Sequence, residues 1–171
     1  MLISKYHPDF VTVTCLNWAP VLAGREHKEI VMNSLRFLVK EERVRVSAFV
    51  LMDTHFHLIW QVMGEHTRED VQRDFLKFTS QQILKNLRNQ NSPLLNDLLV
   101  EAKDRKYQVW ERNSLSVELY SEKVLAQKLD YIHLNPVQAG LCSQPEEYEY
   151  SSAWFYEKNE LNFDFLNHYE D

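Results

Sequence analysis

The sequence predicts an α+β fold in which an antiparallel sheet is covered on one face by helices. Segments with strand-like composition and segments with helical spacing follow one another in the order β, α, β, β, α, β, α. This order is neither a strict βαβ alternation nor an all-β pattern. The length of 171 residues and the apolar content of 44% are typical of one folded domain, which we expect to span residues 1–171.

Three segments carry the main strand signals. Residues 10–16 are rich in β-branched side chains and alternate in part between apolar and polar residues. Residues 44–51 and 55–62 are two further apolar runs, and residues 52–54 lie either between two strands or within one. One or two brief strands are expected around residues 107–119. Together these segments supply the predicted sheet.

Three longer segments carry helical signals. Apolar residues recur at helical spacing between residues 26 and 42, where no glycine or proline interrupts them. A second helix is predicted from residue 68 to residue 87, and a third follows Ser121, which is a suitable N-cap. We expect the third helix to end near Asn135, because Pro136 disfavours helical geometry in the residue before it.

Composition restricts the class of protein. The formal net charge of −6 argues against a protein that coats nucleic acid non-specifically, although a local basic face can still bind phosphates. Cys15 and Cys142 occur in unrelated contexts, so neither a disulfide framework nor a zinc knuckle is indicated. The sequence contains neither a run of about 18 apolar residues nor a signal-peptide pattern. We therefore expect a cytoplasmic protein without a membrane segment.

Two histidines one residue apart, His55 and His57, interrupt the most apolar run of the chain. Side chains at positions i and i+2 of a strand leave the same face roughly 6 to 7 Å apart, so two such imidazoles can bind one cation. Two hydrogen-bonded histidines at the surface of the sheet are the alternative interpretation. This pair alone leaves both interpretations open.

The third predicted helix carries a polar stripe that includes Tyr131 and Asn135. Because these residues are four apart, the Asn135 amide could reach the same cation while Tyr131 faces the same space. A phenol, with a reference pKa of about 10, is a better leaving group than an alkoxide. A phosphotyrosine ester can therefore be reversed by a DNA hydroxyl. A tyrosine packed at the edge of the core is the ordinary alternative.

A metal bound by two neutral imidazoles and one neutral amide keeps its full positive charge and retains open positions. Such a centre suits the polarisation of a phosphodiester better than a structural role. Mixed nitrogen and oxygen ligands fit Mg²⁺ or Mn²⁺, and Zn²⁺ or Co²⁺ would also be accepted. The sequence therefore favours a divalent metal, Mg²⁺ or Mn²⁺, without fixing its identity.

The second predicted helix has a basic side and an opposite apolar side that includes Phe78. A solvated face is the ordinary interpretation of such a stripe. The neighbouring chemistry favours a path for DNA phosphates instead. The candidate DNA-binding residues are Arg73, Lys77, Gln81, Lys85 and Arg112.

Two motifs carry a resemblance to a known family. Residues 48–59, AFVLMDTHFHLI, are similar to the His-hydrophobic-His strand of HUH endonucleases. Residues 131–141, YIHLNPVQAGL, resemble the tyrosine helix of REP-associated tyrosine transposases, and the likeness covers nearly the whole chain. Thr54 departs from the family, whose members usually carry Asn before the first histidine. We expect Thr54 to face away from the ligands and to affect strand support or DNA contacts more than chemistry.

The resemblance implies a ferredoxin-like antiparallel sheet flanked by helices. It also implies cleavage of single-stranded DNA beside a folded hairpin, which leaves a 5′-phosphotyrosine and a free 3′-OH. Tyr131 matches the nucleophile of the family, and His55, His57 and Asn135 match its metal ligands. The expected partner is single-stranded or hairpin DNA. The alternative is a catalytically inactive relative that only binds DNA hairpins, and the sequence leaves both a monomer and a homodimer open.

Overall fold

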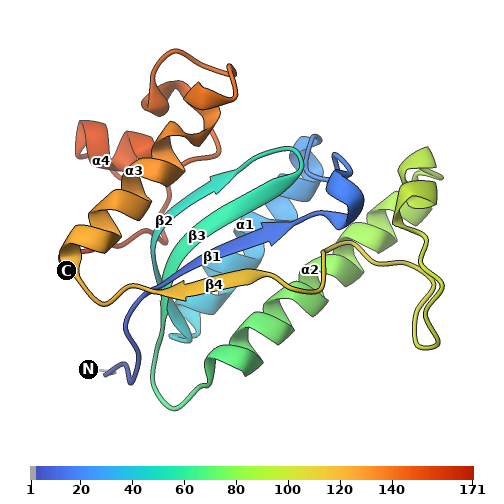
Figure 1. Ribbon diagram of the computed structural model, residues 1–171, viewed down its shortest axis with the longest axis horizontal. Helices are drawn as coiled ribbons and strands as arrows, with labels where there is room; N and C mark the ends of the chain where they lie inside the picture. Colours follow the sequence, from blue (N-terminus) through green and yellow to red (C-terminus); the bar gives the residue numbers. More distant parts are fainter. Residues whose placement is uncertain (1–2) are drawn as a thin grey trace.

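The computed structural model describes residues 3–171, and at its centre lies a four-stranded sheet in the order β2-β3-β1-β4 (Figure 1). Every neighbouring pair of strands is antiparallel. The predicted α+β class with an antiparallel sheet is therefore confirmed. The strands are β1 (Asp9–Thr14), β2 (Val44–Leu51), β3 (His55–Val62) and β4 (Leu115–Glu118).

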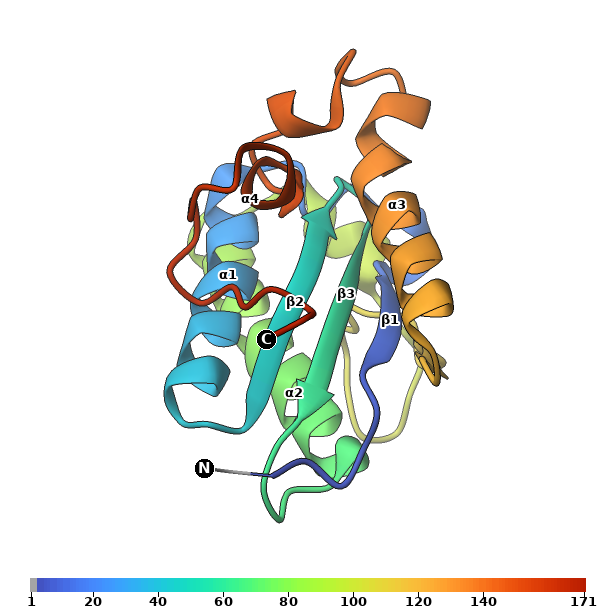
Figure 2. The same cartoon turned by 90° about the vertical axis from the view of Figure 1, so that its left-hand side faces the viewer.

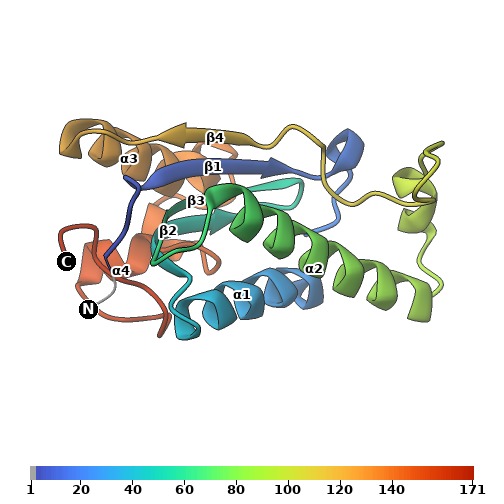
Figure 3. The ribbon, with the colours of Figure 1, turned by 90° about the horizontal axis from the view of Figure 1, so that it is seen from below.

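Helices cover both faces of this sheet, so the prediction of helices on one face only is wrong. Figures 2 and 3 show α1 and α2 on one side of the sheet and α3 on the other. The reason is that β3 is apolar in both directions: Phe56 and Leu58 join one core cluster, and Ile59 joins the other. The helices are α1 (Arg25–Lys40), α2 (Arg68–Asn89), α3 (Glu122–Gln138) and α4 (Ala153–Lys158), with short 3₁₀ helices at η1 (Leu16–Trp18), η2 (Pro93–Leu98) and η3 (Pro145–Glu147).

None of the helices in the described part of the chain combines the length and the apolar character that a membrane crossing requires.

Residues 52–54 form the turn that joins β2 to β3. The register pairs Val50 with His57 and Leu51 with Phe56. Leu51 therefore lies with Phe56 on the side of α1 and α2. A single strand running straight through the turn would have placed Leu51 on the same face as His57 instead, because alternate residues share a face. The turn thus determines which face of β3 carries the histidines, and that face is the one toward α3.

The third helix continues through Pro136 to Gln138, so the prediction that it ends near Asn135 is wrong. Pro136 removes the N–H that would bond within the preceding turn, yet the helix continues for two more residues. Beyond it, a Schellman motif closes the helix: the Leu141 N–H donates to the Pro136 carbonyl at 2.9 Å, and Gly140 adopts φ +75°. The Ser121 hydroxyl caps the other end, as predicted, by accepting from the Val124 N–H at 3.3 Å. Asn135 consequently sits in a regular turn of α3.

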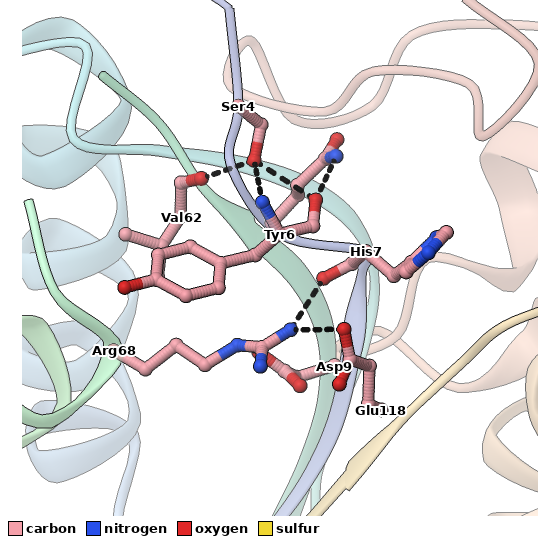
Figure 4. A network of polar contacts seen from close by, with 8 residues as sticks. Ser4, Tyr6, His7, Asp9, Val62, Arg68 and Glu118 are labelled. Atoms are coloured by element: carbon pink, nitrogen blue, oxygen red, sulfur yellow. Dashed lines mark hydrogen bonds and ion pairs between the residues drawn. The ribbon is translucent and has the colours of Figure 1, made fainter. Parts of the chain in front are cut away.

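Arg68, the first residue of α2, fastens this helix to the edge of the sheet (Figure 4). Its guanidinium pairs with Asp9 of β1 at 2.7 Å and with Glu118 of β4 at 2.9 Å. It also donates to the carbonyl of His7 at 3.0 Å. Burial raises the pKa of the Asp9 carboxyl, although Arg68 opposes that shift. The start of α2 is thus fixed to the two strands at the β4 edge.

Candidate active site

His55 and His57 lie side by side on β3, on the face that points toward α3. The centroids of their rings are 5.0 Å apart, and the ring planes are inclined by 72°. His57 is buried beneath α3, and His55 is partly exposed. The i, i+2 spacing therefore produces the pair of neighbouring imidazoles that the strand period requires.

Each imidazole makes one contact through Nδ1. Thr12 of β1 places its hydroxyl 2.8 Å from His57 Nδ1, and Thr54 places its hydroxyl 3.1 Å from His55 Nδ1. If these hydroxyls accept from Nδ1–H, each ring presents the lone pair of Nε2 to the site. The expectation that Thr54 faces away from the ligands is therefore wrong, because the turn brings its hydroxyl back to His55.

Burial keeps both imidazoles neutral. Burial, together with the neighbouring His55 and the charge of Lys128, lowers the pKa of His57 to about 3. Burial also lowers the pKa of His55, although a hydrogen bond with Asn135 acts in the opposite direction. The neutral imidazole is the form that can act as a metal ligand.

Tyr131 of α3 lies over the histidine pair. The centroid of its ring is 5.3 Å from that of His57 and 5.9 Å from that of Phe10, and the side chain is 44% exposed. The Nζ of Lys128, one turn earlier on the helix, is 5.7 Å from the centroid of the Tyr131 ring. The tyrosine is thus packed at its ring, remains accessible to solvent, and has a cation beside it.

Asn135 follows Tyr131 by one turn, and its Oδ1 is 3.3 Å from His55 Nε2. His133 points in another direction, where its Nε2 is 2.8 Å from the Ser152 hydroxyl, and burial lowers its pKa to about 4. His133 is therefore part of the packing that holds α3 on the sheet. One face of α3 anchors the helix, and another presents Tyr131 and Asn135 to the histidines.

The donor set fits a divalent cation. His57 Nε2 is buried and has no hydrogen-bond partner in the described part of the chain, which is costly unless a ligand completes it. His55 Nε2 and Asn135 Oδ1 already converge at 3.3 Å. Within residues 3–171 no three His, Cys, Asp or Glu side chains gather, so a metal bound here would depend on the Asn135 amide. Two nitrogens and one oxygen suit the metals that the sequence favours.

Helix α2 covers the face of the sheet opposite to that of His55 and His57, so its basic side chains are not brought to the histidines (Figure 3). Arg73, Lys77, Gln81 and Arg112 line a common cavity of about 600 Å³ with the segment 104–112. Arg112 also lines a neighbouring cavity with Trp18, whose ring centroid is 5.7 Å from that of His55. Gln108, Glu111 and Arg112 line both cavities, so this segment links the two regions.

Two residues of the predicted basic side, Arg73 and Lys85, are less well placed to bind DNA than the sequence suggests. Arg73 forms ion pairs with Asp70 at 2.8 Å and with Asp74 at 3.1 Å, so its charge is largely compensated. Lys85 does not belong to the lining of the shared cavity.

On the apolar side of α2, which was expected to pack, Phe78 is 51% exposed, because it lies between α1 and α2 at the rim of their interface.

Sequence reasoning missed Thr12 and Lys128. Thr12 reaches His57 only through the pairing of β1 with β3, and no local pattern reveals that pairing. Lys128 precedes Tyr131 by three residues, a helical spacing that could have drawn attention to it.

The antiparallel sheet with helices on both faces and the two histidines beneath α3 are the features to compare with known structures. No protein-family model and no curated protein matches this chain. Among solved structures, the chain is similar to a REP-associated tyrosine transposase bound to a REP hairpin, with a TM-score of 0.66, 17% identity, and coverage of 100% of this chain and 91% of that one. It is also similar to a structure described as a putative transposase from Deinococcus radiodurans R1, with a TM-score of 0.52, 14% identity, and coverage of 77% and 89% respectively. The resemblance found in the sequence is therefore confirmed at the level of the fold.

Proposed function

We propose that this protein is a transposase and endonuclease of single-stranded DNA that cleaves and rejoins DNA beside hairpin sequences through a 5′-phosphotyrosine intermediate. The observation that carries the proposal is the convergence of Tyr131 with His57, whose ring centroids are 5.3 Å apart within one chain. The fold shared with a hairpin-bound transposase supports it. The four residues named for this site, Tyr131, His55, His57 and Asn135, all come from one chain.

In the proposed reaction, the Tyr131 hydroxyl attacks the phosphorus of the scissile phosphodiester. The phenol loses its proton, a bond forms between the phenolic oxygen and phosphorus, and the bond from phosphorus to the 3′ oxygen breaks. The departing 3′ oxygen takes up a proton and becomes a free 3′-OH, while the 5′ side remains attached to Tyr131. A 3′-OH that later attacks this ester restores the phenol, so rejoining needs no ATP.

His55, His57 and Asn135 would hold the divalent metal, Mg²⁺ or Mn²⁺. When bound, such a metal withdraws charge from the phosphate oxygens and so favours attack. The hydroxyls of Thr12 and Thr54 keep the two rings oriented. The Lys128 ammonium adds positive charge where the anionic phosphate would meet Tyr131.

The path of the DNA would extend from this site around the β4 edge of the sheet. Arg112 joins the cavity beside Trp18 to the cavity along α2, where Arg73, Lys77 and Gln81 lie. Lys85 continues the same exposed stripe. A local path of this kind is compatible with a net charge of −6, because phosphate contacts depend on nearby charge.

The proposal is tested by incubating the protein with Mn²⁺ and single-stranded hairpin DNA and looking for a covalent adduct on a denaturing gel. We expect an adduct with the unaltered protein and none with Tyr131→Phe. Tyr120→Phe is the matched control, because Tyr120 is 73% exposed and lies before α3. An adduct that persists in Tyr131→Phe would refute the role of Tyr131. Binding without any adduct would instead support the inactive hairpin-binding alternative.

A further inference from the structure

Trp18 is an exposed aromatic residue beside the candidate active site. Its side chain is 62% exposed, although indoles usually bury most of their surface. The centroid of its ring is 5.7 Å from that of His55, at an interplanar angle of 68°. A large flat apolar surface is thus presented to solvent next to His55, one of the residues proposed to hold the metal.

The backbone holds the indole in this position. Asn17 and Trp18 both have left-handed conformations, with φ of 53° and 55°, which is uncommon for residues other than glycine and unfavourable for a bulky one. The Asn17 N–H donates to Glu111 Oε1 at 2.8 Å, and the Trp18 N–H donates to the Cys15 carbonyl at 3.0 Å. Such a conformation persists only where its surroundings enforce it, and it is found preferentially at functional sites.

Residues 109–111 are hydrogen-bonded to the end of β1 and to η1, the 3₁₀ helix that carries Trp18. The Leu16 N–H donates to the Val109 carbonyl at 2.7 Å, and the Glu111 N–H donates to the Thr14 carbonyl at 2.8 Å. These bonds join the two walls of a cavity of about 480 Å³, so the cavity belongs to the folded framework of the protein. Its lining comprises Thr14, Trp18, Gln108, Glu111, Arg112 and Asn113.

The chemistry of this cavity matches an unpaired nucleobase. The indole offers a surface for stacking, and the guanidinium of Arg112 and the amide of Asn113 offer hydrogen bonds to base edges or to a phosphate. Gln108 uses its amide nitrogen to donate to the Trp110 carbonyl at 2.8 Å, which leaves its amide oxygen as an acceptor. An apolar ligand would use the indole but would leave these polar groups without partners.

We propose that this cavity binds one unpaired base of the DNA strand, stacked on Trp18, beside the candidate metal site at His55. The proposal rests on the proposed function and adds to it a determinant of the cleavage position. A base held here would fix the register of the strand, and so would decide which phosphodiester lies next to Tyr131. Trp18 would act by contact with the substrate and takes no part in the bond-making steps.

The test measures binding without cleavage, using Tyr131→Phe protein without metal and a fluorescent hairpin DNA with short single-stranded flanks. Each flanking nucleotide is replaced in turn by an abasic site. We expect one position whose base removal weakens binding about tenfold, as a single stacked base typically does. Trp18→Ala should weaken binding of the intact DNA by a similar factor and should make that position insensitive to base removal.

Two variants separate stacking from a general effect on the fold. Trp18→Phe keeps an aromatic surface and should retain most of the affinity, and thermal unfolding checks that both Trp18 variants fold. Trp154→Ala is the matched control, because Trp154 is another exposed tryptophan, 37% exposed, on α4. Its removal should leave the abasic pattern unchanged.

The outcomes distinguish this inference from the proposed function. In the combined experiment, the loss of affinity from Trp18→Ala could simply add to the loss from base removal. That result would overturn the base site, even if the Tyr131 adduct forms. Equal affinities of Trp18→Ala and Trp154→Ala would overturn it as well. Conversely, coupling between Trp18 and one base with no adduct in the unaltered protein would support the base site and refute the proposed cleavage.

Discussion

The two faces of β3 differ in what they bury. Phe56 and Leu58 point toward α1 and α2 and are inaccessible to solvent. On the other face, His55 and His57 point toward α3, where the ring of His57 lies against that of the partly exposed Tyr131. One strand thus contributes to the main apolar core with one set of side chains and builds the candidate active site with the other.

The face with the site is also the less completely covered one. At the β4 edge, Leu115 and Val117 are paired with Thr12 and Phe10 of β1, yet remain exposed by 56% and 37%. On the same face His57 keeps a buried Nε2 without a partner in the described part of the chain, which typically costs about 1–3 kcal/mol. Such departures from good packing are expected at functional sites and are tolerated where the rest of the fold is well packed.

Substitutions on the two faces of β3 should separate stability from activity. Phe56→Ala should lower the free energy of unfolding by about 3–5 kcal/mol, because it leaves a cavity against Phe75 and Trp110. His57→Ala should cost less than half as much, since it also removes an unsatisfied polar atom, but should reduce metal-dependent adduct formation at least about a hundredfold. Urea unfolding and the adduct assay measure the two effects. Equal destabilisation by both would show that the α3 face is as much a stabilising core as the other.

The sequence was sufficient where local periodicity decides the structure. β2 and β3 begin and end at the predicted residues, because apolar runs bounded by a short turn have few alternatives. The i, i+2 spacing of His55 and His57 and the i, i+4 spacing of Tyr131 and Asn135 fix which side chains share a face. Spacing does not fix contacts between the two elements, so the expected convergence of the two pairs rested on their joint occurrence and on the family resemblance.

The remainder depends on contacts between distant segments. Thr12 could not be assigned to His57, because the register of β1 against β3 is a property of the sheet. The spacing along α2 revealed its exposed stripe but did not reveal which face of the sheet the helix covers. The end of α3 was misplaced because the bonds that close it lie beyond Pro136, at Gly140.

Thr12 offers a way to weaken the site without disturbing the opposite core. Thr12→Val keeps the shape and the β-branch but removes the hydroxyl 2.8 Å from His57 Nδ1. We expect the affinity for Mn²⁺ to fall about 10–100-fold, as is usual when a metal ligand loses its supporting hydrogen bond. Calorimetric titration of Tyr131→Phe protein measures this affinity without cleavage. Thr12→Ser restores a hydroxyl and should recover most of the binding, and an unchanged affinity in Thr12→Val would show that Thr12 does not support a metal ligand.

The basic stripe of α2 should show the smallest effect, because it lies across the sheet from the site and acts through individual phosphate contacts. Lys77→Ala should weaken hairpin binding a few-fold and should lower the slope of log affinity against log salt by about 1. Lys85→Ala is the matched control, because it removes the same charge two turns away but outside the cavity shared with Arg112. If DNA follows the cavity from Trp18 past Arg112, the loss should be larger for Lys77 than for Lys85. Equal salt slopes for the two variants would mean that α2 attracts DNA only through its general charge, and the two faces of the sheet would then contribute to binding independently.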